Sequence, residues 1–125
     1  MAKAYAPLGV LEMSVMEQVW YAGTATAREV CDRLTGKQER AYTTIMTTME
    51  RLHTKGVLAR AKDANAWRYE PTLSRDAHER AVASALAERI VDAHGDIGLA
   101  AFVDVAASDD LLDRLAALIE ARRKR

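Results

Sequence analysis

Two short runs with alternating side chains, "VLARAK" and "WRYEPT", stand in the middle of a chain whose other segments have helical periodicity. Between them lies "DANA", a stretch of small and polar residues that favours a tight turn. In the second run Trp67 and Tyr69 fall on one face, and Arg68 and Glu70 fall on the other. Pro71 ends the unit because proline cannot donate a strand hydrogen bond. The sequence therefore predicts one β-hairpin within a mainly helical fold.

Three helices are predicted before this hairpin. In "LGVLEMSVMEQVWYAG" the apolar residues recur at steps of three and four, and Gly23 follows as a stop signal. In "TATAREVCDRLTG", Thr26 and Glu29 have the spacing of a capping box, and Gly36 stands where helices often end. The third helix is "RAYTTIMTTMERLHTKG". Its predicted core face consists of Tyr42, Ile45, Met46, Met49 and Leu52.

The opposite face of the third helix is rich in threonine. Stepping about 100° per residue puts these residues on the outward side: Thr43, Thr44, Thr47, Thr48, Arg51, Thr54 and Lys55. An ordinary solvated face favours Glu, Lys and Gln, because β-branched threonine lowers helix propensity. A threonine hydroxyl can instead bond a phosphate or a base edge, while its methyl group contacts the thymine methyl. On this segment alone, DNA contact and simple tolerance at the surface are equally good interpretations.

The hairpin and the charge distribution favour DNA. Three helices followed by a hairpin are the plan of a winged helix-turn-helix, in which the third helix enters the major groove. The formal net charge is zero, but residues 28–68 carry nine Lys/Arg against five Asp/Glu. Such a cationic region favours a nucleic-acid partner. The predicted DNA-contacting residues are Thr43, Thr44, Thr47, Thr48, Arg51, Lys55, Arg60, Lys62 and Arg68.

The composition changes after residue 72. "SRDAHERAVASALAERIVDAHGD" is an alanine-rich helix that begins at Ser74, "IGLAAFVDVAA" is a short apolar piece, and Ser108 caps "DDLLDRLAALIEARRKR". One chain cannot bury this much apolar surface, so we predict that a second copy covers it. We expect a DNA-binding domain at 1–72 and a helical dimerisation domain at 73–125. The predicted dimer contacts are Val82, Leu86, Ile90, Leu99, Phe102, Leu111, Leu115 and Leu118. A ligand pocket among these helices is the alternative.

Catalytic, metal and membrane roles are not predicted. Cys31 is the single cysteine, and the three histidines are far apart without ligand spacing, so we expect no metal, no cofactor and no enzymatic activity. No stretch approaches the roughly 20 apolar residues of a membrane span, and the first residues lack the core of a secretory signal. The expected location is the cytoplasm, without membrane insertion.

The order of these parts, with "LGVLEMSVMEQVW", "AYTTIMTTMERLHTKGVL" and "WRYEPTLSRD", resembles the penicillinase repressor family of BlaI, MecI and CopY transcriptional regulators. The resemblance implies a homodimeric repressor on a palindromic operator, with Thr44 and Thr47 in the segment that contacts DNA. It also implies a route of inactivation, in which a protease activated by a membrane sensor cuts before a phenylalanine. The corresponding bond here is Ala101–Phe102. The cysteine cluster of the copper-responsive branch is absent, so copper sensing is not expected.

Two positions depart from the pattern of that family. Ala41 and Tyr42 replace the usual Ser-Pro at the start of the third helix, which predicts a weaker cap. The wing turn lacks glycine, so Asn65 is expected to adopt any left-handed conformation that the turn needs. Two alternatives stay open, namely a MarR-like regulator that releases DNA on binding a small molecule, and a winged-helix module that binds protein.

Overall fold

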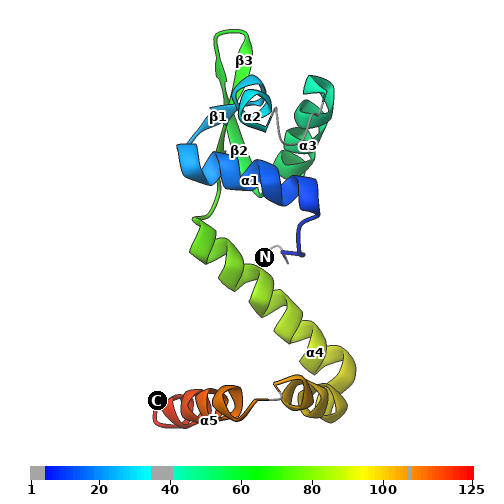
Figure 1. Ribbon diagram of the computed structural model, residues 1–125, viewed down its shortest axis with the longest axis vertical. Coiled ribbons are helices and arrows are strands. Elements are labelled where there is room, and N and C mark those ends of the chain that lie inside the picture. Colours follow the sequence, from blue (N-terminus) through cyan, green and yellow to red (C-terminus); the bar gives the residue numbers. More distant parts are fainter. Residues whose placement is uncertain (1–4, 35–40, 107) are drawn as a thin grey trace. The chain divides into compact units, whose positions relative to one another are not determined.

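The computed structural model describes residues 5–34, 41–106 and 108–125. The chain divides into two compact units between Ala83 and Ser84. Figure 1 follows the chain from the first helix to the last. The elements are α1 (Val10–Ala22), β1 (Ala25–Thr26), α2 (Ala27–Leu34), α3 (Tyr42–Thr54), β2 (Leu58–Asp63), β3 (Ala66–Pro71), α4 (Arg75–Val105) and α5 (Asp109–Arg123).

The first unit has the predicted hairpin, extended by a third short strand. The sheet is antiparallel with the order β1-β3-β2, and β2 pairs with β3 from Leu58 opposite Pro71 to Asp63 opposite Ala66. This register leaves only two residues for the turn. Ala64 has a φ of 57°, and Asn65 is not among the described residues with positive φ. The expectation for Asn65 is therefore wrong, because the left-handed residue of this tight turn is the first of the two.

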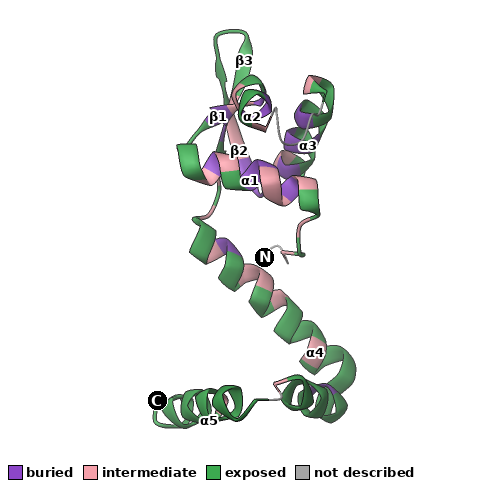
Figure 2. Ribbon diagram, in the orientation of Figure 1, coloured by how far each residue is buried: buried purple, intermediate pink, exposed green. Residues whose placement is uncertain are grey.

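Helices α1, α2 and α3 and the sheet enclose one apolar core. Figure 2 shows buried residues on the faces of these three helices that turn toward one another. The core residues are Val15, Met16, Val19, Ala25, Ala27, Val30, Cys31, Ile45, Met49, Leu52, Val57, Leu58 and Tyr69. Most of them are the apolar residues whose spacing predicted the helices. Burial of this apolar surface is the main stabilising term of the first unit.

The helix ends agree with the predicted signals where the structure describes them. Gly23 closes α1 with a φ of 87°. The Thr26 amide donates to Glu29 Oε1 at 2.9 Å, and the Glu29 amide donates to Thr26 Oγ1 at 3.2 Å, so the capping box is confirmed. No side chain caps α3 at Ala41, as expected from the lost Ser-Pro pair. The predicted stop at Gly36 lies outside the described residues.

The buried face of α3 differs from the prediction at two positions. Met46 was placed in the core but is 44% exposed, whereas Thr48 was placed outside but is 3% exposed. The Thr48 hydroxyl donates to the Thr44 carbonyl oxygen at 2.8 Å, which satisfies its polar atom inside the protein. Since threonine can bond its own helix in this way, it can occupy an apolar site at small cost. The inward face is therefore shifted toward Thr48.

The second unit consists of the later part of α4 and α5. Helix α4 has a kink at Gly95, whose φ of 53° favours glycine. Close packing follows the kink, because a Cβ at Gly98 would lie 2.7 Å from Ile90 Cγ2. The Ser108 hydroxyl accepts from the Leu111 amide at 3.2 Å, so the predicted cap of α5 is present. Among the described residues, no helix is long and apolar enough to cross a membrane.

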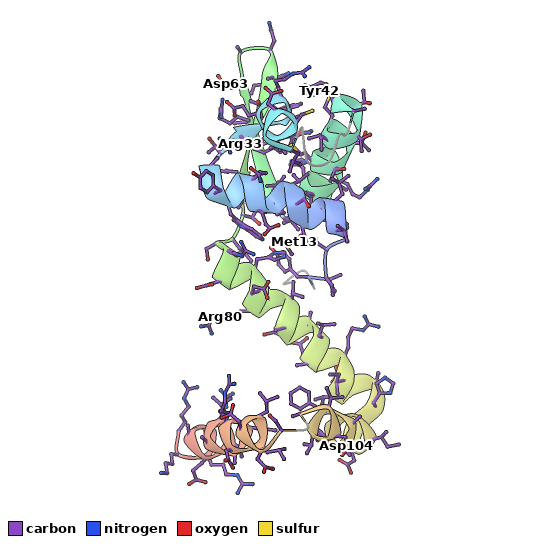
Figure 3. The ribbon with its side chains drawn as sticks, viewed as in Figure 1. Met13, Arg33, Tyr42, Asp63, Arg80 and Asp104 are labelled. Atoms are coloured by element: carbon purple, nitrogen blue, oxygen red, sulfur yellow. The ribbon has the colours of Figure 1, made fainter. Side chains whose placement is uncertain are left out.

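Apolar side chains remain uncovered in this second unit. None of the residues of α5 is buried. In Figure 3 the side chains of α5 project from the ribbon on several sides. The large exposed apolar residues of the unit are Leu86, Val91, Ile97, Leu99, Phe102, Val103, Val105, Leu111, Leu112, Leu118 and Ile119.

Candidate nucleic-acid interface

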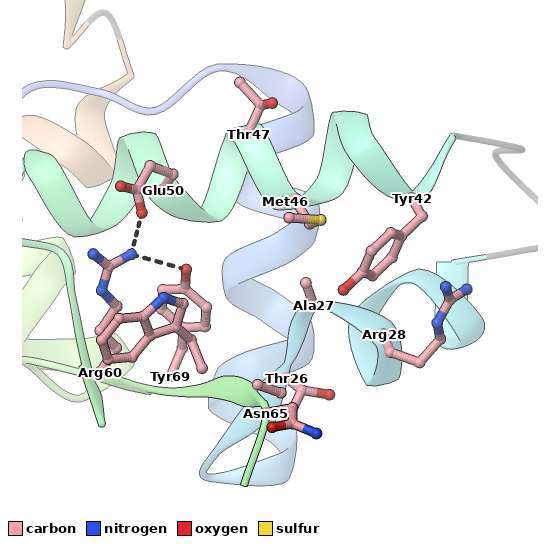
Figure 4. A pocket seen from close by; sticks show the side chains of 12 residues that line it. Thr26, Ala27, Arg28, Tyr42, Met46, Thr47, Glu50, Arg60, Asn65 and Tyr69 are labelled. Carbon is pink, nitrogen blue, oxygen red and sulfur yellow. Dashed lines mark hydrogen bonds and ion pairs between the residues drawn. The ribbon is translucent and has the colours of Figure 1, made fainter. Parts of the chain in front are cut away.

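A cleft of about 490 Å³ lies in the first unit between α3, the beginning of α2 and the two wing strands. Figure 4 shows Met46, Thr47 and Glu50 on α3 at one wall, with Arg60 and Tyr69 of the wing opposite Glu50. The residues whose spacing suggested DNA contact thus stand on one helix beside a hairpin, which is the arrangement by which winged helices hold a duplex.

The predicted hydroxyl face of α3 is present with one exception. Thr43, Thr44, Thr47 and Arg51 are exposed on α3. Thr48 is the exception, because its hydroxyl is buried and already bonded within the helix. The prediction that Thr48 contacts DNA is therefore wrong for this conformation of the helix. Short hydroxyl side chains and a guanidinium group still form one continuous polar surface.

Arg60 was predicted to contact phosphate, but its guanidinium is held within the protein. It forms an ion pair with Glu50 of α3, lies 4.2 Å above the Trp67 ring and donates to the Tyr69 hydroxyl at 3.4 Å. The Tyr69 hydroxyl and the Glu50 carboxylate raise the pKa of Arg60, so the charge is permanent. The Arg60 side chain is only 18% exposed. These contacts connect the recognition helix to the wing.

Arg68 is also engaged by neighbouring groups. Its guanidinium donates to Asp63 at 2.9 Å and to Glu29 at 3.1 Å. Asp63 and Glu29 raise the pKa of Arg68. The hydrogen bond from the Thr26 amide lowers the pKa of Glu29 most, and the hydrogen bond from Arg68 lowers it further. Arg68 thus joins β3 to α2, and a phosphate contact has to compete with two carboxylates.

Of the other predicted cations, Lys55 forms an ion pair with another described residue. Lys55 Nζ lies 2.7 Å from Glu12 Oε2. Burial alone raises the pKa of Glu12, but Lys55 and the Gly9 amide lower it below its usual value. Within the described residues, no ion pair is formed by Arg51 or by Lys62, whose ammonium lies 4.7 Å from the Trp67 ring. Arg51 and Lys62 are therefore the predicted cations most available to phosphate.

Sequence reasoning missed two residues of the cleft. Arg28 places its guanidinium 4.0 Å above the Tyr42 ring, and no sequence spacing indicated this contact between α2 and α3. Glu50 was not assigned a role. Its position one turn after Thr47 was the available signal, because side chains three residues apart share a helix face.

The residues predicted to form dimer contacts lie on α4 and α5, and none of them is buried. Five are exposed on α4 and α5, namely Leu86, Leu99, Phe102, Leu111 and Leu118. Val82, Ile90 and Leu115 are half-buried. Ala101 and Phe102, the predicted cleavage site, are exposed within α4 and line an apolar groove.

Three helices, an antiparallel sheet and an exposed third helix beside a wing define the first unit as a winged helix-turn-helix of the class that binds DNA. The family description "Penicillinase repressor" matches residues 8–121. The chain therefore belongs to the penicillinase repressor family. This family consists of transcriptional regulators, not enzymes.

Individual relatives agree with this assignment over part of the chain. The chain is 39% identical over 70 residues to the transcriptional regulator BlaI of Mycobacterium tuberculosis, a match over 55% of this chain and 51% of that protein. The chain thus spans about half the length of this curated relative. A solution structure of the DNA-binding domain of the repressor BlaI has 27% identity and a TM-score of 0.53, covering 60% of this chain and 90% of that one.

A second solved relative was determined with DNA. It is the monomeric form of Bacillus licheniformis BlaI in complex with the blaP half-operator. It has 26% identity and a TM-score of 0.50, and the match covers 61% of this chain and 92% of that one.

Proposed function

We propose that this protein is a sequence-specific transcriptional repressor that binds a palindromic DNA operator as a homodimer in the cytoplasm. The observation that carries the proposal is the exposed face of α3, where Thr43, Thr44, Thr47 and Arg51 stand free beside the wing. Threonine and arginine at such positions recognise base edges and phosphates. The relative solved with a half-operator supports DNA as the partner.

The homodimer is proposed from the apolar surface of the second unit. Phe102 is 51% exposed and Leu118 is 69% exposed, and single chains rarely keep so many large apolar side chains in water. A two-fold partner would cover the same residues on both copies. The two DNA-binding units would then meet half-sites about one helical turn apart, roughly 34 Å, or a multiple of that distance.

Relief of repression is proposed to occur by proteolysis at Ala101–Phe102, through a membrane sensor-protease system. Both residues are exposed, and α4 ends four residues later at Val105. Helix ends open more readily than helix centres, which would give a protease access to the extended backbone that it needs. A cut here would divide the apolar surface on which the homodimer depends.

The test of the central proposal compares Thr47→Ala with Thr54→Ala. Both threonines are exposed on α3, but Thr54 is its last residue. Duplexes selected from a random pool by the full chain serve as operator. We expect Thr47→Ala to lose about 1 to 3 kcal/mol of discrimination at one base pair, and Thr54→Ala to keep the wild-type preference. Lys62→Ala is expected to weaken binding to all DNA sequences alike. It should also reduce, by about one, the slope of the logarithm of the binding constant against the logarithm of the salt concentration.

Binding of the wild-type chain is measured by fluorescence anisotropy at several salt concentrations. If the wild-type chain selects no motif, or if Thr47→Ala and Lys62→Ala have the same effect on selected and random duplexes, sequence-specific recognition by α3 is excluded.

A further inference from the structure

The pairing of Glu50 with Arg60 leaves the carboxylate, and not the arginine, as the more exposed partner in the cleft. The Glu50 side chain is 55% exposed, whereas the Arg60 side chain beneath it is 18% exposed. Trp67 and Tyr69 cover the guanidinium from the wing side. A duplex that approaches this part of α3 therefore meets a carboxylate before it meets the arginine.

A carboxylate on a DNA-binding face is unfavourable unless it has a specific partner. Phosphates repel it at any sequence, since both groups are anionic. In the major groove, however, a Glu or Asp side chain can accept a hydrogen bond from the N4 amino group of cytosine. A carboxylate at this place thus penalises binding in general and favours a duplex with a correctly placed cytosine.

The geometry prepares Glu50 for such a contact. Its Oε2 is bound to Arg60, while Oε1 has no hydrogen-bond partner among the described residues. Arg60 is itself fixed by the Trp67 ring at 4.2 Å and by the Tyr69 hydroxyl at 3.4 Å. One oxygen thus fixes the orientation of the side chain and the other remains free. Figure 4 shows Glu50 and Arg60 joined across the cleft, one turn along α3 from Thr47.

We infer that Glu50 is a specificity-determining residue that accepts a hydrogen bond from a cytosine amino group, and that Arg60 is its positioning residue. The inference rests on the proposed function, because it needs α3 in the major groove. It assigns Arg60 to the orientation of Glu50, in place of the predicted phosphate contact. It also gives a role to the contacts of Arg60 with the Trp67 ring and the Tyr69 hydroxyl, which hold the guanidinium in place.

The experiment selects duplexes from a random pool with the full-length wild type, Glu50→Ala, Glu50→Gln and Glu70→Ala. We expect the wild type to prefer cytosine at one position of each half-site, and Glu50→Ala to reduce that preference about five- to tenfold. Glu50→Gln is expected to move the preference toward adenine, because an amide can bond both N6 and N7 of that base. Binding of Glu50→Ala to random duplexes should tighten, since a repulsive charge is removed.

Glu70→Ala is the matched control. Glu70 is an exposed carboxylate on β3, so its removal changes the net charge equally without touching the Glu50–Arg60 pair. It should leave the base preference unchanged. Arg60→Gln should weaken the cytosine preference while Glu50 is still present, which a merely structural ion pair would not do. Circular dichroism melting confirms that each variant is folded.

The outcomes separate the two proposals. If the wild type selects a motif and Glu50→Ala selects the same motif with the same preference, Glu50 does not read a base and this inference is overturned. The inference is also overturned if Glu50→Ala and Glu70→Ala change the affinity for all duplexes equally, because only net charge then matters. If the wild type selects no motif at all, the proposed function itself fails.

Discussion

The two units of this chain differ in how far their apolar side chains are buried. The winged unit places Ile45, Met49 and Leu52 of α3 at 0% exposure in a core shared by three helices and a sheet. In the second unit α5 has no buried residue, although it carries four leucines and an isoleucine. The winged unit therefore has an apolar core of its own, whereas the helical unit leaves its large apolar side chains exposed.

The polar groups show the same difference. In the winged unit, ion pairs join different elements, such as Lys55 of the α3 end with Glu12 of α1 and Arg68 of β3 with Glu29 of α2. In α5, the ion pairs Arg114–Asp110 and Lys124–Glu120 connect residues four apart on one helix. Pairs between elements fix a tertiary structure, while pairs within an exposed helix add only a few tenths of a kcal/mol to that helix.

The largest expected effect comes from the core of the winged unit. Ile45→Ala should lower the free energy of unfolding by about 2 to 5 kcal/mol, because it leaves a cavity among packed side chains. Leu118→Ala should cost less than about 0.5 kcal/mol in the dissociated chain, since Leu118 is 69% exposed. Urea unfolding at several protein concentrations measures both variants. If both variants lost the same free energy of unfolding at the lowest protein concentration, the two units would not differ in how much their apolar side chains stabilise the single chain.

A smaller effect is expected when a charge is added to the uncovered surface. Phe102→Asp should raise the dissociation constant of the proposed homodimer about 30-fold, or roughly 2 kcal/mol, because a carboxylate would have to enter an apolar interface. Val10→Asp is the control, because it adds the same charge at a residue that is 83% exposed on α1 of the winged unit. Sedimentation equilibrium measures both constants. A shift of the same size in both variants would show that net charge, not the surface around Phe102, controls association.

The sequence was sufficient for elements whose signals are local. Periodicity predicted the three helices, and the Thr26–Glu29 spacing predicted a capping box that is confirmed at both hydrogen bonds. The hairpin itself followed from the alternation in the two runs and from the turn residues between them. These features depend on neighbours within a few residues, so one sequence contains the necessary information.

The parts that could not be predicted depend on contacts between elements. Arg68 and Glu29 are 39 residues apart, and no pattern indicated their pairing. The Glu50–Arg60 pair likewise required the distance between α3 and the wing. Thr48 and Met46 exchanged their expected places, because a helix periodicity defines a face only approximately and the packing of neighbouring elements against α3 decides its edges. Functional assignment of single cations is therefore the least predictable step.

The smallest expected effect compares two histidines of the same helix. His78, in the part of α4 that belongs to the winged unit, is 2% exposed and lies with its ring 5.4 Å from Tyr5 and 5.3 Å from Trp20. Its Nε2 has no hydrogen-bond partner among the described residues. Burial lowers the pKa of His78 below 6.5, although the neighbouring Glu79 opposes this shift. His94 is exposed in the second unit.

The sign of the pH effect follows from this lowered pKa. Below pH 6.5 the unfolded chain binds a proton at His78 more readily than the folded chain does, so stability is lost as the pH falls. Between pH 7.5 and 5.5 we expect a loss of less than about 1 kcal/mol from this group. His78→Phe should flatten the pH dependence of urea unfolding in this range, and His78→Gln tests the same slope if the larger ring disturbs packing. His94→Gln, which removes an exposed imidazole from the second unit, serves as the control variant. A slope that survives both His78 variants would assign the pH dependence to other groups.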